Sequence, residues 1–213
     1  MAITESTWSF PGDKNTEKEM SHVVNGIIHN MTNADWSLCN WIQELDPTLD
    51  KQPKNSVVYV EFGSTSKFNQ QQLEELAKGL DILNRPFLWV AWSGLTDKSC
   101  HSYSNKYMKR VASRGKIVEW ASQEIVLGNP SIACFITHCG WSSVMESASM
   151  GVPLVCWPYF GDQMYAKSCI CDAWKVGVWF KPNESGIVSR NEIKETANEV
   201  LSPVSLSRKM CSI

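Results

Sequence analysis

The sequence predicts an α/β protein in which a parallel, doubly wound sheet carries helices on both faces. Three observations predict this class. Short apolar runs rich in β-branched residues recur between residues 56 and 180, as expected for strands buried on both faces. Stretches with apolar residues at helical spacing lie between these runs. The connection between the first two runs is long enough for a helix, and such crossovers join parallel strands.

The first strand–helix–strand unit is the most regular part of the sequence. Residues 56–62 (SVVYVEF) form a nearly continuous apolar run, which predicts a buried strand. The helix expected over residues 69–83 carries its leucines at helical spacing, and Asn69 with Gln72 can cap its start. An Asn-Arg-Pro sequence then stops the helix, and residues 87–92 (FLWVAW) are expected to be the next strand.

The alternation continues to the end of the last predicted helix. Residues 93–114 are polar and rich in Ser, Lys and Tyr, which predicts a loop or a poorly patterned helix. Beyond this segment, strands are expected at residues 116–120, 134–137, 154–157 and 176–180, and helices at 122–127, 142–150, 162–174 and 189–201. Residues 51–201 are therefore expected to form one domain, and the weakly patterned residues 1–50 and 202–213 to be loosely held.

Composition and charge exclude several classes of protein. With 20 basic and 22 acidic residues among 213, the net charge is −2, so nothing favours binding to nucleic acid or to an anionic membrane surface. No apolar run approaches the roughly 20 residues of a membrane span, and the N-terminus lacks the features of a secretion signal. The eight cysteines show no zinc-binding spacing and are expected to be free thiols instead of disulfides. We therefore expect a cytoplasmic protein without a bound metal.

A potential anion site lies where the fourth predicted strand meets the helix expected from Ser142. The backbone N–H groups and the dipole at the start of that helix attract anions, and Gly140 lets a phosphate approach the backbone. His138 and Ser143 can add donors, and Glu146, one turn on, can accept hydroxyls of a ribose. The alternative is that Ser143 and Glu146 form a capping box and that His138 is a satisfied core residue.

Further residues are expected at the same edge, because the carboxyl ends of parallel strands lie together. Trp120 offers a flat face for stacking a base, although a single tryptophan can equally be buried. Asp162 and Gln163, at the start of another helix, can hold sugar hydroxyls, although capping of that helix explains them as well. Ser64 and Gln123 lie at the same edge. Together these residues favour a site for a base, a ribose, a phosphate and a sugar.

Residues 120–163, WASQEIVLGNPSIACFITHCGWSSVMESASMGVPLVCWPYFGDQ, resemble without a gap the donor-binding box of plant secondary-product UDP-glycosyltransferases. HCGW and the final DQ are highly specific parts of that box, and VVYVEFGS and RPFLWV resemble the two strands that precede it. The resemblance covers at least residues 50–200. It implies the Rossmann-like C-terminal domain of a GT-B glycosyltransferase, with UDP-glucose as donor and no metal or other cofactor. An NAD(P) dehydrogenase is disfavoured because the first strand ends in FGST instead of GxGxxG.

The resemblance implies a role for each residue of the predicted site. Trp120 would stack on uracil, Ala121 would hydrogen-bond to it through its backbone, and Gln123 would lie near the ribose. Glu146 would accept the ribose hydroxyls. The other binding residues would be, for the diphosphate, Ser64, His138, Gly140, Ser143 and the amides around Trp141 and Ser142, and, for the sugar, Trp141, Asp162 and Gln163. The Gln at the end of the box is associated with glucose in this family.

Three positions depart from the family pattern. Ser122 stands where Pro is usual, Asn129 where His is usual, and Ser142 where Asn is usual. That Asn normally helps to hold the diphosphate, whereas a serine is shorter but keeps a donor. We expect this change to weaken donor binding by up to about 0.5–1.5 kcal/mol, the net contribution of one hydrogen bond.

The family's catalytic His and its Asp partner belong to an N-terminal domain of which this sequence contains little. Residues 33–40 resemble the last strand of that domain, and His22 and His29 lack the strand–His–turn setting of the catalytic base. We therefore assign no catalytic residue, and expect acceptor binding only with an N-terminal half. Two function classes follow. One is the donor-binding half of a glucosyltransferase that acts on hydroxyls of small molecules. The other is an inactive UDP-sugar-binding module from a truncated gene or splice product.

Overall fold

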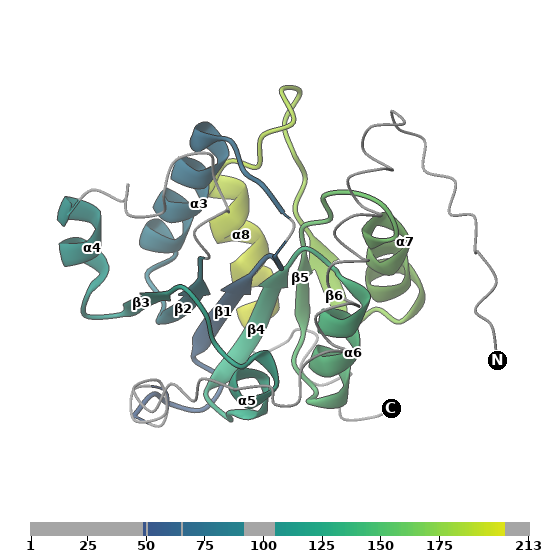
Figure 1. Cartoon of the computed structure of the whole chain (residues 1–213), viewed down its shortest axis with the longest axis horizontal. Helices are drawn as coiled ribbons and strands as arrows, with labels where there is room; N and C mark the ends of the chain where they lie inside the picture. The colour runs from purple at the N-terminus through teal and green to yellow at the C-terminus, as the bar shows by residue number, and fades with distance from the viewer. Residues whose placement is uncertain (1–48, 50, 65, 92–104, 203–213) are drawn as a thin grey trace, which may run out of the picture. The chain divides into compact units, whose positions relative to one another are not determined.

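The computed structural model describes residues 49, 51–64, 66–91 and 105–202 (Figure 1). The predicted division into residues 1–50, 51–201 and 202–213 stays a prediction, because most of the first and last segments lies outside the described residues. The strand expected within residues 33–40 lies outside them as well, and so do His22 and His29.

Within the described ranges, six parallel strands form one sheet in the order β3-β2-β1-β4-β5-β6 (Figure 1). The strands are β1 (Val57–Glu61), β2 (Phe87–Val90), β3 (Gly115–Val118), β4 (Ile132–Thr137), β5 (Leu154–Cys156) and β6 (Gly177–Trp179). The predicted fold class is confirmed. Each strand lies within about two residues of its predicted bounds, because a buried parallel strand has an apolar run that turn residues interrupt on both sides.

Helices connect the strands: α3 (Gln70–Leu83), α4 (Asn105–Val111), α5 (Gln123–Gly128), α6 (Trp141–Ser149), α7 (Gln163–Ser168) and α8 (Arg190–Leu201). Of the two alternatives for residues 93–114, the described part contains a helix, α4. The single helix predicted over residues 162–174 is wrong in its second half. There α7 gives way to a π-helical turn, η2 (Cys169–Ala173), in which the Trp174 N–H donates to the Cys169 carbonyl at 2.7 Å.

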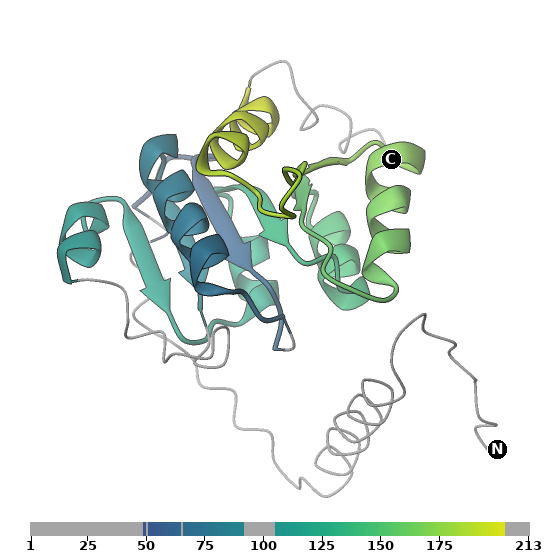
Figure 2. The ribbon, with the colours of Figure 1, turned by 90° about the horizontal axis from the view of Figure 1, so that it is seen from above.

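The alternation of side chains along β1 divides the core into two layers. Val58, Val60 and Phe62 belong to the layer under α3 and α8, whereas Val57 and Tyr59 belong to the layer under α5, α6 and α7. Figure 2 shows α3 in blue and α8 in yellow side by side over one face of the sheet. Because both faces are covered, the strands need apolar residues on both sides, as their sequences show.

Polar side chains join α3 to the start of α8. Asn69 accepts a hydrogen bond from the Gln72 N–H at 2.8 Å, so this part of the predicted cap is confirmed. The Gln72 side chain does not reach back to complete a capping box. Its amide instead pairs with the backbone of Val188 in both directions, at 2.9 Å each. Nearby, the Arg190 Nε and backbone N–H donate to Glu75 at 2.9 and 2.8 Å.

The order of the strands creates a natural place for a ligand. β1 and β4 are hydrogen-bonded neighbours, but the chain continues from β1 to β2 and β3 on one side and from β4 to β5 and β6 on the other. At such a reversal the loops that follow the two central strands diverge and leave a crevice beyond their carboxyl ends. The predicted binding residues cluster in the loops at this point of the sheet.

Two expectations from composition can be compared with the structure. The five cysteines within the described residues are all free thiols: Cys134, Cys139, Cys156, Cys169 and Cys171. Cys39, Cys100 and Cys211 lie outside the described residues. Among the helices in the described ranges, none combines the length and apolar character that crossing a bilayer requires.

Candidate functional site

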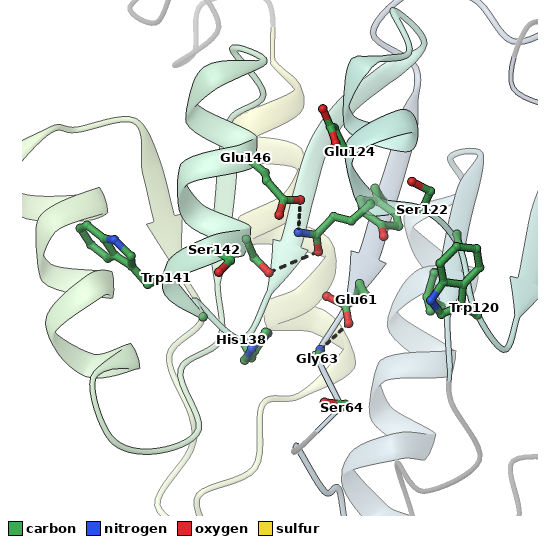
Figure 3. A pocket seen from close by; sticks show the side chains of 16 residues that line it. Glu61, Gly63, Ser64, Trp120, Ser122, Glu124, His138, Trp141, Ser142 and Glu146 are labelled. Atoms are coloured by element: carbon green, nitrogen blue, oxygen red, sulfur yellow. Dashed lines mark hydrogen bonds between the residues drawn. The ribbon is translucent and has the colours of Figure 1, made fainter. Parts of the chain in front are cut away.

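An open pocket of about 550 Å³ lies beyond the carboxyl ends of β1 and β4 (Figure 3). Three segments supply most of its lining: residues 61–64 at the end of β1, residues 120–124 at the start of α5, and residues 138–146 at the start of α6, with Tyr59 and Val90 added from the strands. Its volume falls in the usual range of small-molecule sites, roughly 300–1,000 Å³. The pocket therefore occupies the crevice that the strand order predicts.

Ten of the twelve residues predicted to bind a UDP-sugar line this one pocket. They are Ser64, Trp120, Ala121, Gln123, His138, Gly140, Trp141, Ser142, Ser143 and Glu146. Asp162 and Gln163 are not among the lining residues. The structure thus brings together side chains from three separate loops, which the sequence places up to about 80 residues apart.

The His138 ring lies against the backbone of two glycines. A Cβ at Gly63 would come within 2.7 Å of the ring, and one at Gly140 within 2.5 Å, so only glycine fits at either position. Gly63 also has a φ of +66°, which side chains disfavour. Burial lowers the pKa of His138 to about 4, although the Asp162 carboxylate opposes the shift. His138 is therefore a neutral imidazole at physiological pH, able to donate one hydrogen bond but not to supply a positive charge.

The turn into α6 leaves the start of the helix open to a ligand. Gly140 is the N-cap residue, and no side chain among the described residues caps the helix there. The preceding Cys139 adopts a left-handed φ of 67°, uncommon for a residue other than glycine, and its side chain is buried. The first backbone N–H groups of a helix have no partner within the helix, so those of α6 are available to an anion.

The alternative of a capping box between Ser143 and Glu146 is wrong, because Gln123 hydrogen-bonds to both side chains. The Gln123 Nε2 donates to a Glu146 carboxylate oxygen at 2.6 Å, and the Ser143 hydroxyl donates to the Gln123 Oε1 at 3.2 Å. These two bonds, drawn in Figure 3, connect α5 to α6 across the pocket. Gln123 therefore fixes the position of the Glu146 carboxylate, a task that the sequence did not reveal.

The two tryptophans stand at opposite ends of the pocket in Figure 3. Trp120 is 46% exposed, so the alternative that it is buried in the core is wrong. Its ring is accessible for stacking. Trp141 is equally exposed, and its ring centroid lies 6.1 Å from that of Trp174.

Sequence reasoning missed several residues of the pocket, among them Tyr59 and Glu61 on β1. The Glu61 carboxyl accepts a hydrogen bond from the Gly63 N–H. Burial raises the pKa of Glu61 to about 7, the Gly63 bond opposes this, and the nearby Glu146 adds to it. The sequence places Glu61 in a strand and not in the site. Because Glu61 follows Tyr59 by two residues, both side chains lie on the same face of β1, and this spacing is the signal that could have identified Glu61.

The protein family follows from comparison with known sequences and structures. The family model described as UDP-glucoronosyl and UDP-glucosyl transferase matches residues 38–201. The chain belongs to this family. It is 31% identical to UDP-glycosyltransferase 83A1 of Arabidopsis thaliana over 94% of this chain and 50% of that relative. It is 43% identical to phloretin 4'-O-glucosyltransferase of Malus domestica over 72% of this chain and 33% of the relative.

Solved structures of glycosyltransferases share the fold. Os79 from O. sativa, in complex with U2F and trichothecene, matches with a TM-score of 0.75 and 35% identity, over 81% of this chain and 39% of Os79. Phytolacca americana UGT2, without ligand, matches with a TM-score of 0.73 and 32% identity, over 81% of this chain and 42% of UGT2. The resemblance to plant UDP-glycosyltransferases is confirmed. The chain spans about a third to a half of the length of the curated relatives it matches.

The end of the segment 120–163 has a structural task. The Gln163 side chain is buried, and its Oε1 accepts the Tyr159 and Phe160 N–H groups at 2.7 and 3.0 Å. Gln163 thereby ties the loop after β5 to the first turn of α7. Asp162 is exposed at the N-cap of α7 and forms no side-chain capping bond, so simple capping does not explain it.

The described part of the chain contains no group of three or more His, Cys, Asp or Glu side chains placed to hold a metal ion. The pocket also lacks cationic side chains: among its lining residues in the described ranges there is no lysine or arginine. Attraction for an anion must therefore come from the N-terminus of α6 and from neutral donors.

Proposed function

We propose that this chain is the donor-binding part of a UDP-glucosyltransferase and that it binds UDP-glucose in the pocket beyond β1 and β4. The observation that carries the proposal is the convergence of the family-matched residues. Ten residues, singled out by their positions in a sequence motif, line one pocket of suitable volume at the switch point of the sheet. Solved relatives such as Os79 were determined in complex with UDP, which supports the same ligand here.

The uracil and ribose are assigned to the side of the pocket near α5. The exposed ring of Trp120 stacks on the base, and the backbone of Ala121 hydrogen-bonds to it. The ribose hydroxyls donate to Glu146, whose carboxylate Gln123 already orients. A preoriented carboxylate binds more tightly than a mobile one, because less conformational entropy is lost on binding.

The diphosphate is assigned to the start of α6. Its oxygens accept hydrogen bonds from backbone N–H groups of the helix and from the hydroxyls of Ser64, Ser142 and Ser143. Neutral His138 donates a further bond, and the absence of side chains at Gly63 and Gly140 lets the phosphates approach.

The sugar is assigned to the side of Trp141 and α7. Asp162 is exposed at the start of α7 and acts electrostatically on His138, which lines the pocket, and this supports its assignment to the sugar. Gln163 contributes through the loop after β5, whose backbone its side chain holds. Glucose is the proposed sugar because the terminal Gln matches the family's glucose-associated position and relatives are named as glucosyltransferases.

For the whole protein we propose transfer of glucose from UDP-glucose to a hydroxyl of a small molecule. The free thiols of the described residues support a reducing, cytoplasmic location. Residues 51–201 are proposed as the donor-binding domain.

A second candidate function is binding of UDP-sugars without transfer, since no family-matched catalytic His or Asp was identified in the 213 residues. Lack of a general base lowers a rate by roughly 10²–10⁴-fold. Incubation of the purified chain with UDP-glucose and hydroxylated acceptors, followed by mass spectrometry, is expected to show no glucoside. Acceptor-dependent glucoside would mean that these residues contain a base.

The donor-binding proposal is tested by calorimetry with UDP. Trp120→Ala is expected to weaken binding by roughly 1–3 kcal/mol, the usual worth of stacking a base on an aromatic ring. The control is Trp179→Ala, which removes another partly exposed tryptophan that does not line the pocket. Equal affinity of the Trp120→Ala variant and the wild type would overturn the assignment of the base.

A further inference from the structure

The charged residues of the pocket have the wrong sign for its proposed ligand. The lining residues include Glu61, Glu124 and Glu146, and none in the described part of the chain is a lysine or arginine. The diphosphate of a sugar nucleotide carries two negative charges of its own. The ionisation state of these carboxyls must therefore affect how well the pocket accepts it.

The three carboxyls differ in their surroundings. Glu124 is exposed on the first turn of α5, and water screens its charge. Glu146 accepts a hydrogen bond from Gln123 at 2.6 Å, which holds its carboxylate in place. Glu61 is largely buried at the end of β1, and Figure 3 shows it in the middle of the pocket, bonded to the Gly63 N–H.

No cation among the described residues faces Glu61. From its own strand the facing titratable group is Tyr59, and from α6 it is Glu146. His138 reaches the pocket from the end of β4 and is neutral at physiological pH. Glu124 lines the pocket from α5. A charge on Glu61 is thus opposed by its neighbours, and a second anion beside it would be opposed further.

The Tyr59 hydroxyl, at the floor of the pocket, lacks a hydrogen-bond partner within the described part of the chain. Tyr59 is fully buried and lines the pocket, yet its hydroxyl has no hydrogen-bond partner among the described residues. A buried polar group without a partner destabilises a structure, and a ligand or a water can relieve this. Tyr59 and Glu61 lie on the same face of β1, so a polar group at this position meets both side chains.

We propose that Glu61 determines the affinity of the pocket for the sugar nucleotide: the diphosphate is accepted only while the Glu61 carboxyl carries its proton. This inference rests on the proposed function and adds to it a residue that controls binding. Protonated Glu61 removes the like charge and offers an O–H donor, whereas ionised Glu61 repels the diphosphate.

The size of the effect follows from the pKa of Glu61, which burial raises to about 7. When only one protonation state binds, the apparent dissociation constant rises as the fraction of that state falls. Between pH 6 and pH 8 the protonated fraction of a group with this pKa falls roughly tenfold. The dissociation constant for the ligand is expected to rise by about the same factor.

The test is calorimetric titration of the full chain with UDP-glucose at pH 6, 7 and 8. UDP-glucose is the probe because its diphosphate is esterified at both ends and does not titrate in this range. Wild-type affinity is expected to fall about tenfold over these two units. Glu61→Gln, which is neutral and of the same shape, is expected to bind equally well at all three values. Glu119→Gln removes an exposed charge outside the pocket and is expected to keep the wild-type profile.

A measurement on the wild type alone makes the test independent of how the variant folds. Titrations at pH 8 in two buffers of different protonation enthalpy report proton uptake, expected to be roughly one proton per UDP-glucose bound. Zero uptake, or a pH profile that Glu61→Gln leaves unchanged, would overturn the role of Glu61 while leaving donor binding intact. Failure of all variants and the wild type to bind UDP-glucose at pH 6 would instead overturn the proposed function itself.

Discussion

Two glutamates of this domain show opposite behaviour. Glu75, where α3 meets α8, pairs with the Arg190 guanidinium, and these hydrogen bonds lower its pKa to about 2. Glu61, at the floor of the pocket, faces no cation among the described residues, and burial raises its pKa to about 7. The first region is built for stability, since Gln72 and Glu75 both have hydrogen-bond partners at the start of α8. The second leaves polar groups unpaired, as is typical of a site completed by a ligand.

The comparison teaches that unfavourably placed polar groups lie in the crevice beyond the carboxyl ends of β1 and β4. The face under α3 and α8 joins the two helices through Gln72 and Glu75, which both bond to the start of α8. At the carboxyl ends of β1 and β4, by contrast, Glu61, neutral His138 and left-handed Cys139 lie together. Such clusters of perturbed residues are a mark of functional sites.

The largest expected effect comes from removing the charge of Glu61. Folded Glu61 keeps its proton up to about pH 7, whereas the unfolded residue loses it near 4.5. The contribution of Glu61 to the free energy of unfolding therefore falls as pH rises from 4.5 to 7, by up to about 3 kcal/mol. Glu61→Gln is expected to be more stable than the wild type by about that amount at pH 8, with a smaller difference at pH 5, in urea unfolding experiments. An identical difference at both pH values would contradict the unpaired state of Glu61.

His138 is expected to give a pH dependence of opposite sign. Its folded pKa of about 4 lies below the ordinary 6.5, so the unfolded chain takes up a proton first as pH falls. Stability contributed by neutral His138 is complete above pH 6.5 and is lost toward pH 4, on the order of 2 kcal/mol. His138→Asn is expected to abolish this loss, so that the free energy of unfolding of the variant rises monotonically from pH 7 to pH 4.5. Retention of the wild-type profile would show that His138 is not buried in its neutral form.

The smallest of these effects belongs to the paired glutamate. Glu75→Gln is expected to lower the free energy of unfolding at pH 7 by about 1 kcal/mol, since Arg190 is partly exposed and water screens the pair. Because pairing lowers the pKa of Glu75 below the ordinary 4.5 to about 2, its contribution is present above pH 4.5 and lost as pH falls toward 2. Glu74→Gln, an exposed neighbour on the same helix, is the control. A Glu75→Gln variant as stable as the control would remove the contrast between the two regions.

The sequence predicts the strands well because buried parallel strands leave a strong apolar signal, as in VVYVE and IACFIT. It predicts helix ends less well. The π-helical turn after Ser168 contains an i to i+5 bond from the Trp174 N–H to the Cys169 carbonyl, which no periodicity reveals. Likewise, Ser143 and Glu146 have the spacing of a capping box, but Gln123 from another helix engages both.

The binding motif predicts which residues meet, and it does not predict their electrostatics. Trp120 and Glu146 were singled out because their residue types suit a base and a ribose. Glu61 was missed because one acidic residue at the end of an apolar run carries no motif, and its importance depends on burial and on the neighbours that the fold supplies. Tertiary surroundings thus decide which carboxyl is charged, and these lie beyond local sequence patterns.

A crystal structure of the chain with UDP tests the central claim most directly. We expect the uracil ring on the exposed face of Trp120, the ribose hydroxyls at Glu146, and the diphosphate within hydrogen-bond distance of the first N–H groups of α6. UDP bound elsewhere on the domain, or bound with its base away from Trp120 and its phosphates away from α6, would contradict the assignment of this pocket as the donor site.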